Sequence, residues 1–283
     1  MAAWIVMKVD KLIKSELEYF APILYSQRKT SKTMLEAWRR ETLAQRCERI
    51  SLETFDLCEG KVLRGLFSGL KLNRDTCWGK SDLGAQCLGF YEKEILDVIA
   101  VQDPFDTFLN LGSADGFYAV GMLHAKMAKK AICFELSEEG RSQVKENWLI
   151  NESPGELEVH GEATEQSIYS VVNRLSENTL VLIDIEGGEF GLLSQDLIAL
   201  IGKYKVIIEI HNWIDGFEEK YAALLTDLDR FFDIAIIPPS ERNSVNDEIL
   251  RSYPDENRLL VSSERRPCLM RFLYLVPKKQ ISE

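Results

Sequence analysis

The sequence predicts an α/β fold in which helices cover both faces of a seven-stranded, mostly parallel sheet. Three observations support this prediction. From about residue 101 onward, short apolar runs alternate with stretches of helical apolar spacing, the pattern of strands joined by crossover helices. The run at 179–184 is strongly apolar, as strands buried on both faces of a parallel sheet are. The run at 106–111 stops at a glycine-containing turn, 112–116, where glycine lets the backbone reverse sharply before a helix.

The first 90 residues differ from the rest of the chain. The segments 8–25 and 31–55 combine helical apolar spacing with dense charge, which predicts amphipathic helices. The stretch 63–72 is glycine-spaced and strand-like. We therefore expect an N-terminal helical region and lead-in over 1–90 and the sheet domain over 91–283. The helices are either a solvated appendage or a lid or dimerisation arm.

The elements of the sheet domain can be placed in order from their apolar spacing. Ser137 is a suitable N-cap for the helix that follows it, and Pro238-Pro239 ends the sixth strand. A polar loop over 240–257 precedes the last strand. The expected strands are 106–111, 131–134, 157–160, 179–184, 205–211, 233–237 and 268–276, and the expected helices are 117–127, 137–150, 164–175, 190–201 and 217–231.

Composition narrows the possible partners. The net charge of −11 argues against a phosphate-backbone partner, so we expect no nucleic acid. The six cysteines are scattered with no CxxC pair, which favours reduced thiols and a cytoplasmic protein. No apolar run is long enough to span a bilayer. The oligomeric state cannot be predicted from these features.

The stretch from Asp106 to Glu135 has the organisation of a nucleoside-binding βαβ unit. Gly112 and Gly116 lie in the turn after the first strand, and Glu135 follows the second strand. An acid about 20 residues beyond the turn is placed to bind ribose hydroxyls. The G-x-G-x-x-G spacing of dinucleotide-binding dehydrogenases is absent, so that class ranks lower.

Ionisable residues follow the fourth and fifth strands. Asp184 and Glu186 are two residues apart, as are Glu209 and His211, and residues i and i+2 of a strand share a face. Because the carboxyl ends of parallel strands meet at one edge, we expect the four side chains to converge there. The alternatives are a reactive site and a set of caps and salt bridges at the rim of the sheet.

The chain from about Phe67 onward resembles the FkbM-type S-adenosylmethionine-dependent methyltransferases, which have a Rossmann-like fold. The resemblance rests on Leu109–Tyr118 (LNLGSADGFY), similar to that family's D-I-G-A-N-x-G-x-Y turn, and on Phe134-Glu135. It also rests on Asp184–Glu189 (DIEGGE), similar to D-x-E-G-x-E, and on Ile208–His211 (IEIH). It implies a methyltransferase whose cofactor is S-adenosylmethionine.

The resemblance also implies residue roles. The glycine turn would line the methionine and ribose region, Glu135 would bind the ribose, and Glu162 and Ala163 would lie near adenine. The family usually carries an acid where Asn110 stands, and asparagine supplies no charge to pair with the cofactor's ammonium. The expected cofactor-binding residues are Asn110, Gly112, Ser113, Asp115, Gly116, Glu135, Glu162, Ala163 and Asp184.

The family resemblance points to a hydroxyl on a sugar, glycan or small metabolite as methyl acceptor. A hydroxyl must lose a proton, which requires a base or a metal that lowers its pKa. The expected catalytic residues are His211, Asp184 and Glu209. No metal ligand is assigned, although Asp184, Glu186 and Glu209 holding Mg²⁺ remains an alternative. Another alternative is a binding or scaffold protein that keeps the fold without turnover. In either case, we expect the N-terminal helices to help close the acceptor side.

Overall fold

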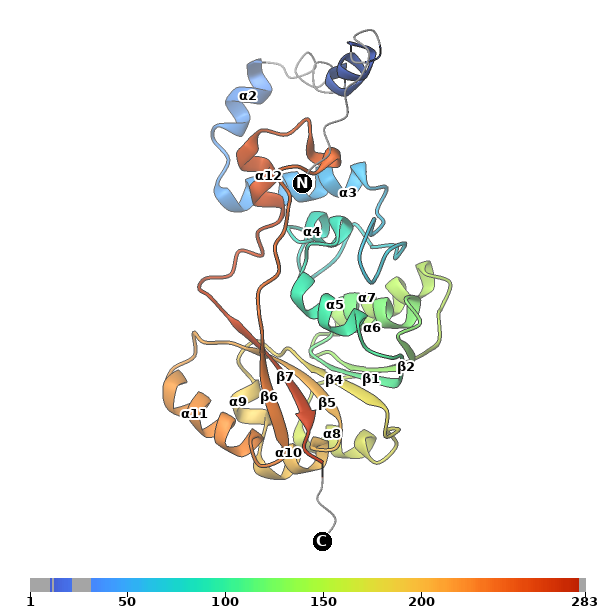
Figure 1. The fold of residues 1–283 in the computed structure, drawn as a ribbon, viewed down its shortest axis with the longest axis vertical. Coiled ribbons are helices and arrows are strands. Elements are labelled where there is room, and N and C mark those ends of the chain that lie inside the picture. Colours follow the sequence, from blue (N-terminus) through green and yellow to red (C-terminus); the bar gives the residue numbers. More distant parts are fainter. Residues whose placement is uncertain (1–10, 12, 22–31, 280–283) are drawn as a thin grey trace.

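The computed structural model describes residues 11, 13–21 and 32–279, and the remainder of the expected first helix lies outside the described residues. Figure 1 shows the sheet in the lower part of the molecule and a group of helices above it. The elements are α2 Lys32–Trp38, α3 Leu43–Leu57, α4 Leu83–Leu88, α5 Lys93–Ala100, β1 Phe105–Leu111, α6 Phe117–His124, β2 Ala128–Phe134, α7 Glu138–Ile150, β3 Glu156–His160, α8 Glu165–Val172, β4 Thr179–Ile183, α9 Glu189–Leu192, α10 Gln195–Ile201, β5 Lys205–Ile210, α11 Phe217–Leu228, β6 Phe232–Ile237, the 3₁₀ helix η1 Glu248–Leu250, α12 Asp255–Val261 and β7 Arg271–Pro277.

The seven strands form one sheet in the order β3-β2-β1-β4-β5-β7-β6. Strands β1 to β5 pair in parallel, and β7 runs antiparallel to both β5 and β6. From β1 the chain adds β2 and β3 on one side of the sheet and then crosses to β4 on the other side. The strand order therefore reverses between β1 and β4. The carboxyl ends of β1, β2, β4 and β5 therefore share one edge, where ligands bind in folds of this kind. The predicted Rossmann-like α/β fold is confirmed.

Alternation of side chains along each strand gives the sheet two apolar faces. Phe108 of β1 packs with helices α5, α6 and α7, whereas its neighbour Leu109 packs with α8, α10 and α11. The same alternation separates Leu182 from Val181 in β4, as a two-residue period requires. The core thus lies on both sides of the sheet, with helices on both faces (Figure 1).

A third core lies above the carboxyl edge, in a group of helices that we call the helical cap: α3, α4, η1 and α12. Phe55 of α3 and Leu83 of α4 pack there with Leu250 of η1 and Val261 of α12. A Cβ at Gly84 would lie 2.9 Å from Val261 and 3.0 Å from the backbone of α3, so these helices approach closely. The cap is therefore built from residues before β1 and from the connection between β6 and β7. The domain boundary near residue 90 stays a prediction.

Two expectations about connecting segments are wrong. The stretch 63–72 is not a strand: the chain turns at Gly65 and Gly69, whose φ angles are +81° and +91°, beside one isolated bridge between Lys61 and Lys71. The segment 240–257 is not simply a polar loop, because it contains η1 and the start of α12. These helices have three and seven residues, too few for a helical period to show in the sequence.

The helix expected over 190–201 is two helices, α9 and α10. The break occurs at Ser194, whose Oγ accepts a hydrogen bond of 3.2 Å from the backbone N–H of Leu197 and so caps α10. An N-cap residue has extended backbone angles, and Ser194 has φ −65° and ψ 160°. All six cysteines are free thiols. Within the described residues, none of the helices has the length and apolar character needed to cross a membrane.

Candidate functional site

Gly112 brings the end of β1 into direct contact with the end of β4. It follows β1 with φ +84°, and a Cβ there would lie 1.6 Å from the carbonyl oxygen of Asp184. No side chain fits in that space, and the backbone angle also favours glycine. The backbone N–H groups of Gly112 and Ser113 donate to the carbonyl of Phe134 at 3.0 and 2.9 Å. The turn is thus fixed against both neighbours of β1.

Glu135, the residue after β2, holds two loops together. Its Oε2 accepts a hydrogen bond of 2.9 Å from the N–H of Ala114, and its Oε1 accepts one of 2.8 Å from the N–H of Ser137. Each carboxylate oxygen has a second lone pair. The carboxylate can therefore accept further hydrogen bonds from a diol while it fixes the glycine turn and the start of α7.

These loops line a cavity of about 640 Å³ that we call the apolar cavity. A cavity of this size suits a ligand as large as a nucleoside derivative. Of the expected cofactor residues, Gly112, Glu135, Glu162, Ala163 and Asp184 line it. The remaining wall is Trp78, Ala114, Phe134, Leu136, Ser137, Thr164, Glu165, Ile185, Glu186, Gly188, Gly191 and Leu192.

The other four expected cofactor residues lie behind the turn rather than in the cavity lining. Asn110 is 1% exposed within β1 and donates from Nδ2 to the carbonyl of Gly112 at 3.2 Å. Asp115 accepts from the Thr76 hydroxyl at 2.7 Å and from the N–H of Phe117 at 3.2 Å. Ser113 is buried, and Gly116 is the N-cap of α6. In this structure they shape the turn, and their contact with a cofactor stays a prediction.

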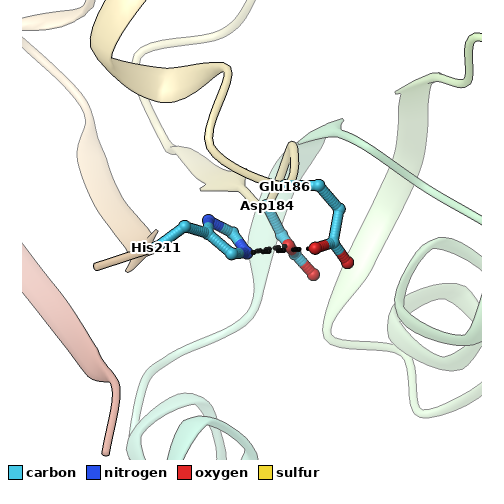
Figure 2. Close-up of side chains that lie close together, drawn as sticks. All are labelled: Asp184, Glu186 and His211. Carbon is cyan, nitrogen blue, oxygen red and sulfur yellow. Dashed lines mark ion pairs between the residues drawn. The ribbon is translucent and has the colours of Figure 1, made fainter. Parts of the chain in front are cut away.

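A second cavity, of about 520 Å³, lies beside the first, over the ends of β4 and β5. We call it the acidic cavity. The two share Trp78, Asp184 and Glu186. The four ionisable residues expected to converge here do so, since Asp184, Glu186, Glu209 and His211 all line it. The Nε2 atom of His211 lies 3.6 Å from Asp184 Oδ1, 3.7 Å from Glu186 Oε2 and 3.8 Å from Glu209 Oε2. Figure 2 shows the Asp184 and Glu186 carboxylates beside this ring nitrogen.

Glu189 sets the orientation of His211. Its side chain is fully buried, and its Oε1 lies 3.1 Å from Nδ1 of His211 and accepts from the N–H of the same residue at 2.9 Å. Its Oε2 accepts from the N–H of Gly187 at 3.0 Å. Nδ1 therefore carries hydrogen, and Nε2 is the nitrogen that faces the cavity. The sequence motif contained Glu189, but this orienting role was not predicted.

The charges around the acidic cavity change the pKa values of its members. Burial lowers the pKa of His211. The hydrogen bond and charge of Glu189, together with the charges of Glu209 and Glu186, raise it by a larger amount, so the pKa of His211 lies above its ordinary value. Burial, followed by the charges of Glu209 and Glu92, raises the pKa of Asp184 well above its ordinary value. The cluster thus holds more negative charge than its surroundings stabilise, and it favours a proton or a cation.

Arg266 supplies one cation to the acidic cavity. Its Nη1 pairs with Glu209, its Nη2 lies 3.3 Å from Glu92, and its Nε lies 2.7 Å from Glu264. Glu92 is 3% exposed and also accepts a hydrogen bond from the Tyr118 hydroxyl. This network joins the segment before α5, the end of β5 and the residues before β7.

Several side chains of the acidic cavity could not be placed beside β4 and β5 from the sequence. Trp78 and Asp82 come from the lead-in to α4, and Arg265 and Arg266 come from the segment before β7. Nothing in the local sequence pattern links these segments to β4 or β5. Glu48 of α3 also lines the cavity, so one of the N-terminal helices forms part of its wall. The role of these helices in closing an acceptor site stays a prediction.

No family model and no curated protein matches this sequence. Solved structures are similar in fold. One is a candidate tRNA methyltransferase from Streptococcus pneumoniae, with 13% identity over 68% of this chain and 72% of that one and a TM-score of 0.42. Another is an rRNA methylase from Streptococcus thermophilus, at 10% identity, 64% and 91% coverage and a TM-score of 0.40. A third is a candidate methyltransferase from Streptococcus mutans in complex with SAH, at 11% identity, 63% and 93% coverage and a TM-score of 0.40.

The expectation that excluded nucleic acid as a partner is contradicted by these neighbours. One of the three is a candidate tRNA methyltransferase and another is an rRNA methylase. The exclusion relied on the net charge of the whole chain, −11. A net charge sums over every surface, whereas binding of a phosphate backbone depends on the charges around the binding face. The FkbM subtype and the cytoplasmic location stay predictions.

Proposed function

We propose that the protein is an S-adenosylmethionine-dependent methyltransferase of the FkbM type that methylates a hydroxyl group. The observation that carries the proposal is the meeting of two cavities of different character at Asp184 and Glu186. Direct transfer of a methyl group requires a donor site and an acceptor site that open onto each other. The apolar cavity is suited to the donor, and the acidic cavity to a polar acceptor.

The residues of the apolar cavity fit the proposed cofactor, which supplies an activated methyl group when bound. Glu135 offers free lone pairs for the two ribose hydroxyls while it holds the turn through Ala114 and Ser137. Leu136, Ala163 and Leu192 give apolar contacts for a purine ring. Gly112 lets the turn lie directly against the backbone of Asp184, so the glycine turn reaches the junction with the acidic cavity. These features support a nucleoside-type ligand.

The residues of the acidic cavity support a hydroxyl acceptor. Methyl transfer to a hydroxyl requires loss of its proton, and Asp184, Glu209 and His211 gather at the junction with the apolar cavity. Glu189 keeps the Nε2 atom of His211 directed there. Polar walls also suit the many hydroxyls of a sugar, a glycan or a polar metabolite. The ribose hydroxyls of RNA belong to the same chemical class.

Calorimetric titration with S-adenosylmethionine and SAH tests the donor site. We expect one-to-one binding and a loss of about 1.5–3 kcal/mol of binding free energy in Glu135→Ala, the value of a charge-assisted hydrogen-bonding group. The exposed Glu138, in the first turn of α7, gives the matched control Glu138→Gln with unchanged affinity. Because Glu135 also holds two loops, Glu135→Gln is the second variant, and circular dichroism checks its fold. Unchanged affinity in both Glu135 variants would sink the donor-site assignment.

A turnover assay separates an enzyme from a binding protein. Release of SAH is measured with sugar, glycan, small polyol and RNA acceptors. Turnover with any hydroxyl acceptor supports the proposal and identifies the class. Tight binding of the cofactor without turnover on any acceptor favours the alternative of a scaffold protein.

A further inference from the structure

Asp184, Glu186 and His211 have the geometry of an ion-binding site. One ligand atom from each lies within 4.8 Å of the others, and Figure 2 shows the three groups directed toward one point. The Nε2 atom of His211 is 3.6 Å from Asp184 Oδ1 and 3.7 Å from Glu186 Oε2. These separations are too long for hydrogen bonds. They match ligands that each lie about 2.1 Å from one shared cation and so about 3–4 Å apart.

The burial and hydrogen bonding of two of these side chains also call for a ligand. His211 is 1% exposed, so its cavity-facing nitrogen has little access to water. Asp184 Oδ1 is buried and has no hydrogen-bond partner in the described part of the chain. An unpaired buried polar atom is costly. A group that coordinates both atoms removes that cost.

The arginines of the acidic cavity are committed elsewhere. Arg266 pairs with Glu92, Glu209 and Glu264, and Arg265 pairs with Asp82 at 2.6 Å. Among the described residues, no lysine or arginine forms an ion pair with Asp184 or Glu186. A second carboxylate group, Glu92, Asp184 and Glu209, also has ligand spacing, but Arg266 already serves two of its members. The uncompensated group is therefore the one that contains His211.

Glu189 completes the arrangement as an outer partner. Histidine ligands in metal sites donate their second ring N–H to a carboxylate or carbonyl, which fixes the tautomer and increases the basicity of the ligating nitrogen. The buried Glu189 stands 3.1 Å from Nδ1 of His211 in that position. A histidine held in this way is oriented for a metal at Nε2.

We propose that Asp184, Glu186 and His211 bind one divalent cation. One imidazole nitrogen and two carboxylate oxygens form a mixed ligand set that suits Mn²⁺ or Zn²⁺. Three protein ligands leave coordination positions that face the acidic cavity for water or an acceptor oxygen. The use of the ion in methyl transfer rests on the proposed function, whereas the binding itself does not.

The test is a titration of the cofactor-free protein with Mn²⁺ alone. The concentration of free Mn²⁺ is measured at each step by electron paramagnetic resonance. We expect saturation at one equivalent, competition by Zn²⁺, and a nitrogen coupling to bound Mn²⁺ in pulsed spectra. Glu189→Gln removes the outer partner of His211 and should weaken binding of the ion about 10–100-fold. Asp184→Asn and His211→Gln each remove a ligand, so each should weaken binding by more than that. The control is His160→Gln, because His160 also follows a carboxylate at a strand end, 2.8 Å from Glu158, but lies outside the cluster.

Three results would overturn the proposal. These are the absence of stoichiometric binding of either ion, equal binding by wild type and His211→Gln, and bound Mn²⁺ without nitrogen coupling. The first result means that protons, rather than a cation, occupy the cluster. If a buried variant fails to fold, the exposed Glu186 gives Glu186→Gln, which must weaken binding in the same titration. Since the titration contains no cofactor, its failure leaves the donor site untouched, and failure of the Glu135 test leaves the ion site untouched.

Discussion

The apolar and acidic cavities share three residues but are assembled in different ways. The turn and acid at the centre of the apolar cavity come from one βαβ unit, and backbone N–H groups make its central contacts, such as that of Ala114 to Glu135. The acidic cavity joins β4 and β5 to α3, to the lead-in to α4 and to the segment before β7. Its central contacts are between ionisable side chains, such as Arg266 and Glu92. A local motif can specify the first kind of site, whereas the second requires the complete tertiary structure.

The largest expected effect separates the roles of the two cavities: a change in the acidic cavity should affect turnover but not cofactor binding. His211 lines only the acidic cavity, so His211→Ala should lower kcat by about 10²–10⁴, the usual effect of losing proton handling at a reacting group. SAH affinity, measured by calorimetry, should stay at the wild-type value. The control is His124→Gln on α6, which lines neither cavity. Parent turnover in His211→Ala would mean that the acceptor reacts elsewhere.

The junction of the two cavities depends on Gly112. Gly112→Ala combines a positive φ with a Cβ 1.6 Å from the Asp184 carbonyl, so we expect a loss of about 4 kcal/mol in the free energy of unfolding. Urea denaturation measures it. Gly161→Ala is the matched control, because nothing lies within 4 Å of a Cβ there, and it should stay within about 0.5 kcal/mol. Equal stabilities of the two variants would contradict the close contact of β1 and β4.

Loss of an arginine side chain should lower the free energy of unfolding more at the acidic cavity than at the protein surface. Arg266→Gln leaves Glu92 and Glu209, both under 7% exposed in their side chains, without their arginine. Breaking a buried ion pair on one side costs about 3 kcal/mol. Arg174→Gln, which breaks a pair with Glu158 from an exposed arginine, should cost less than about 1 kcal/mol. Unfolding free energies of the two variants make the comparison, and equal losses would show that the Arg266 network is solvated.

The smallest expected effect is a pH-dependent contribution to stability at the edge of the sheet beside the apolar cavity. The hydrogen bond from Arg174, with those from Lys130 and His160, lowers the pKa of Glu158 from 4.5 to about 2 despite partial burial. A lowered pKa stabilises the fold above pH 4.5, and that contribution is lost as the pH falls through about 2. Because Glu158 is partly exposed, we expect only about 1 kcal/mol. The difference in unfolding free energy between wild type and Glu158→Gln should shrink from pH 6 to pH 2.5; a constant difference would contradict the pKa direction.

Much of the sheet could be predicted because its strands are continuous apolar runs, such as Thr179–Ile183 and Lys205–Ile210. The convergence of Asp184 and His211 followed from parallel pairing, which brings strand ends to one edge. The cap could not be predicted in the same way, since Leu250 and Val261 lie in helices of three and seven residues, which are too short to show a helical period. The link from Arg266 to Glu92 spans 174 positions, and no local pattern encodes such a contact.

The composition of the helical cap has a consequence for synthesis of the chain. Phe55 and Leu83 are made early, but they pack against Leu250 and Val261, which leave the ribosome almost two hundred residues later. Contacts between residues so far apart in sequence form late. During translation the apolar faces of α3 and α4 therefore remain uncovered until the segment before β7 has emerged. Exposed faces of this kind favour aggregation of incomplete chains.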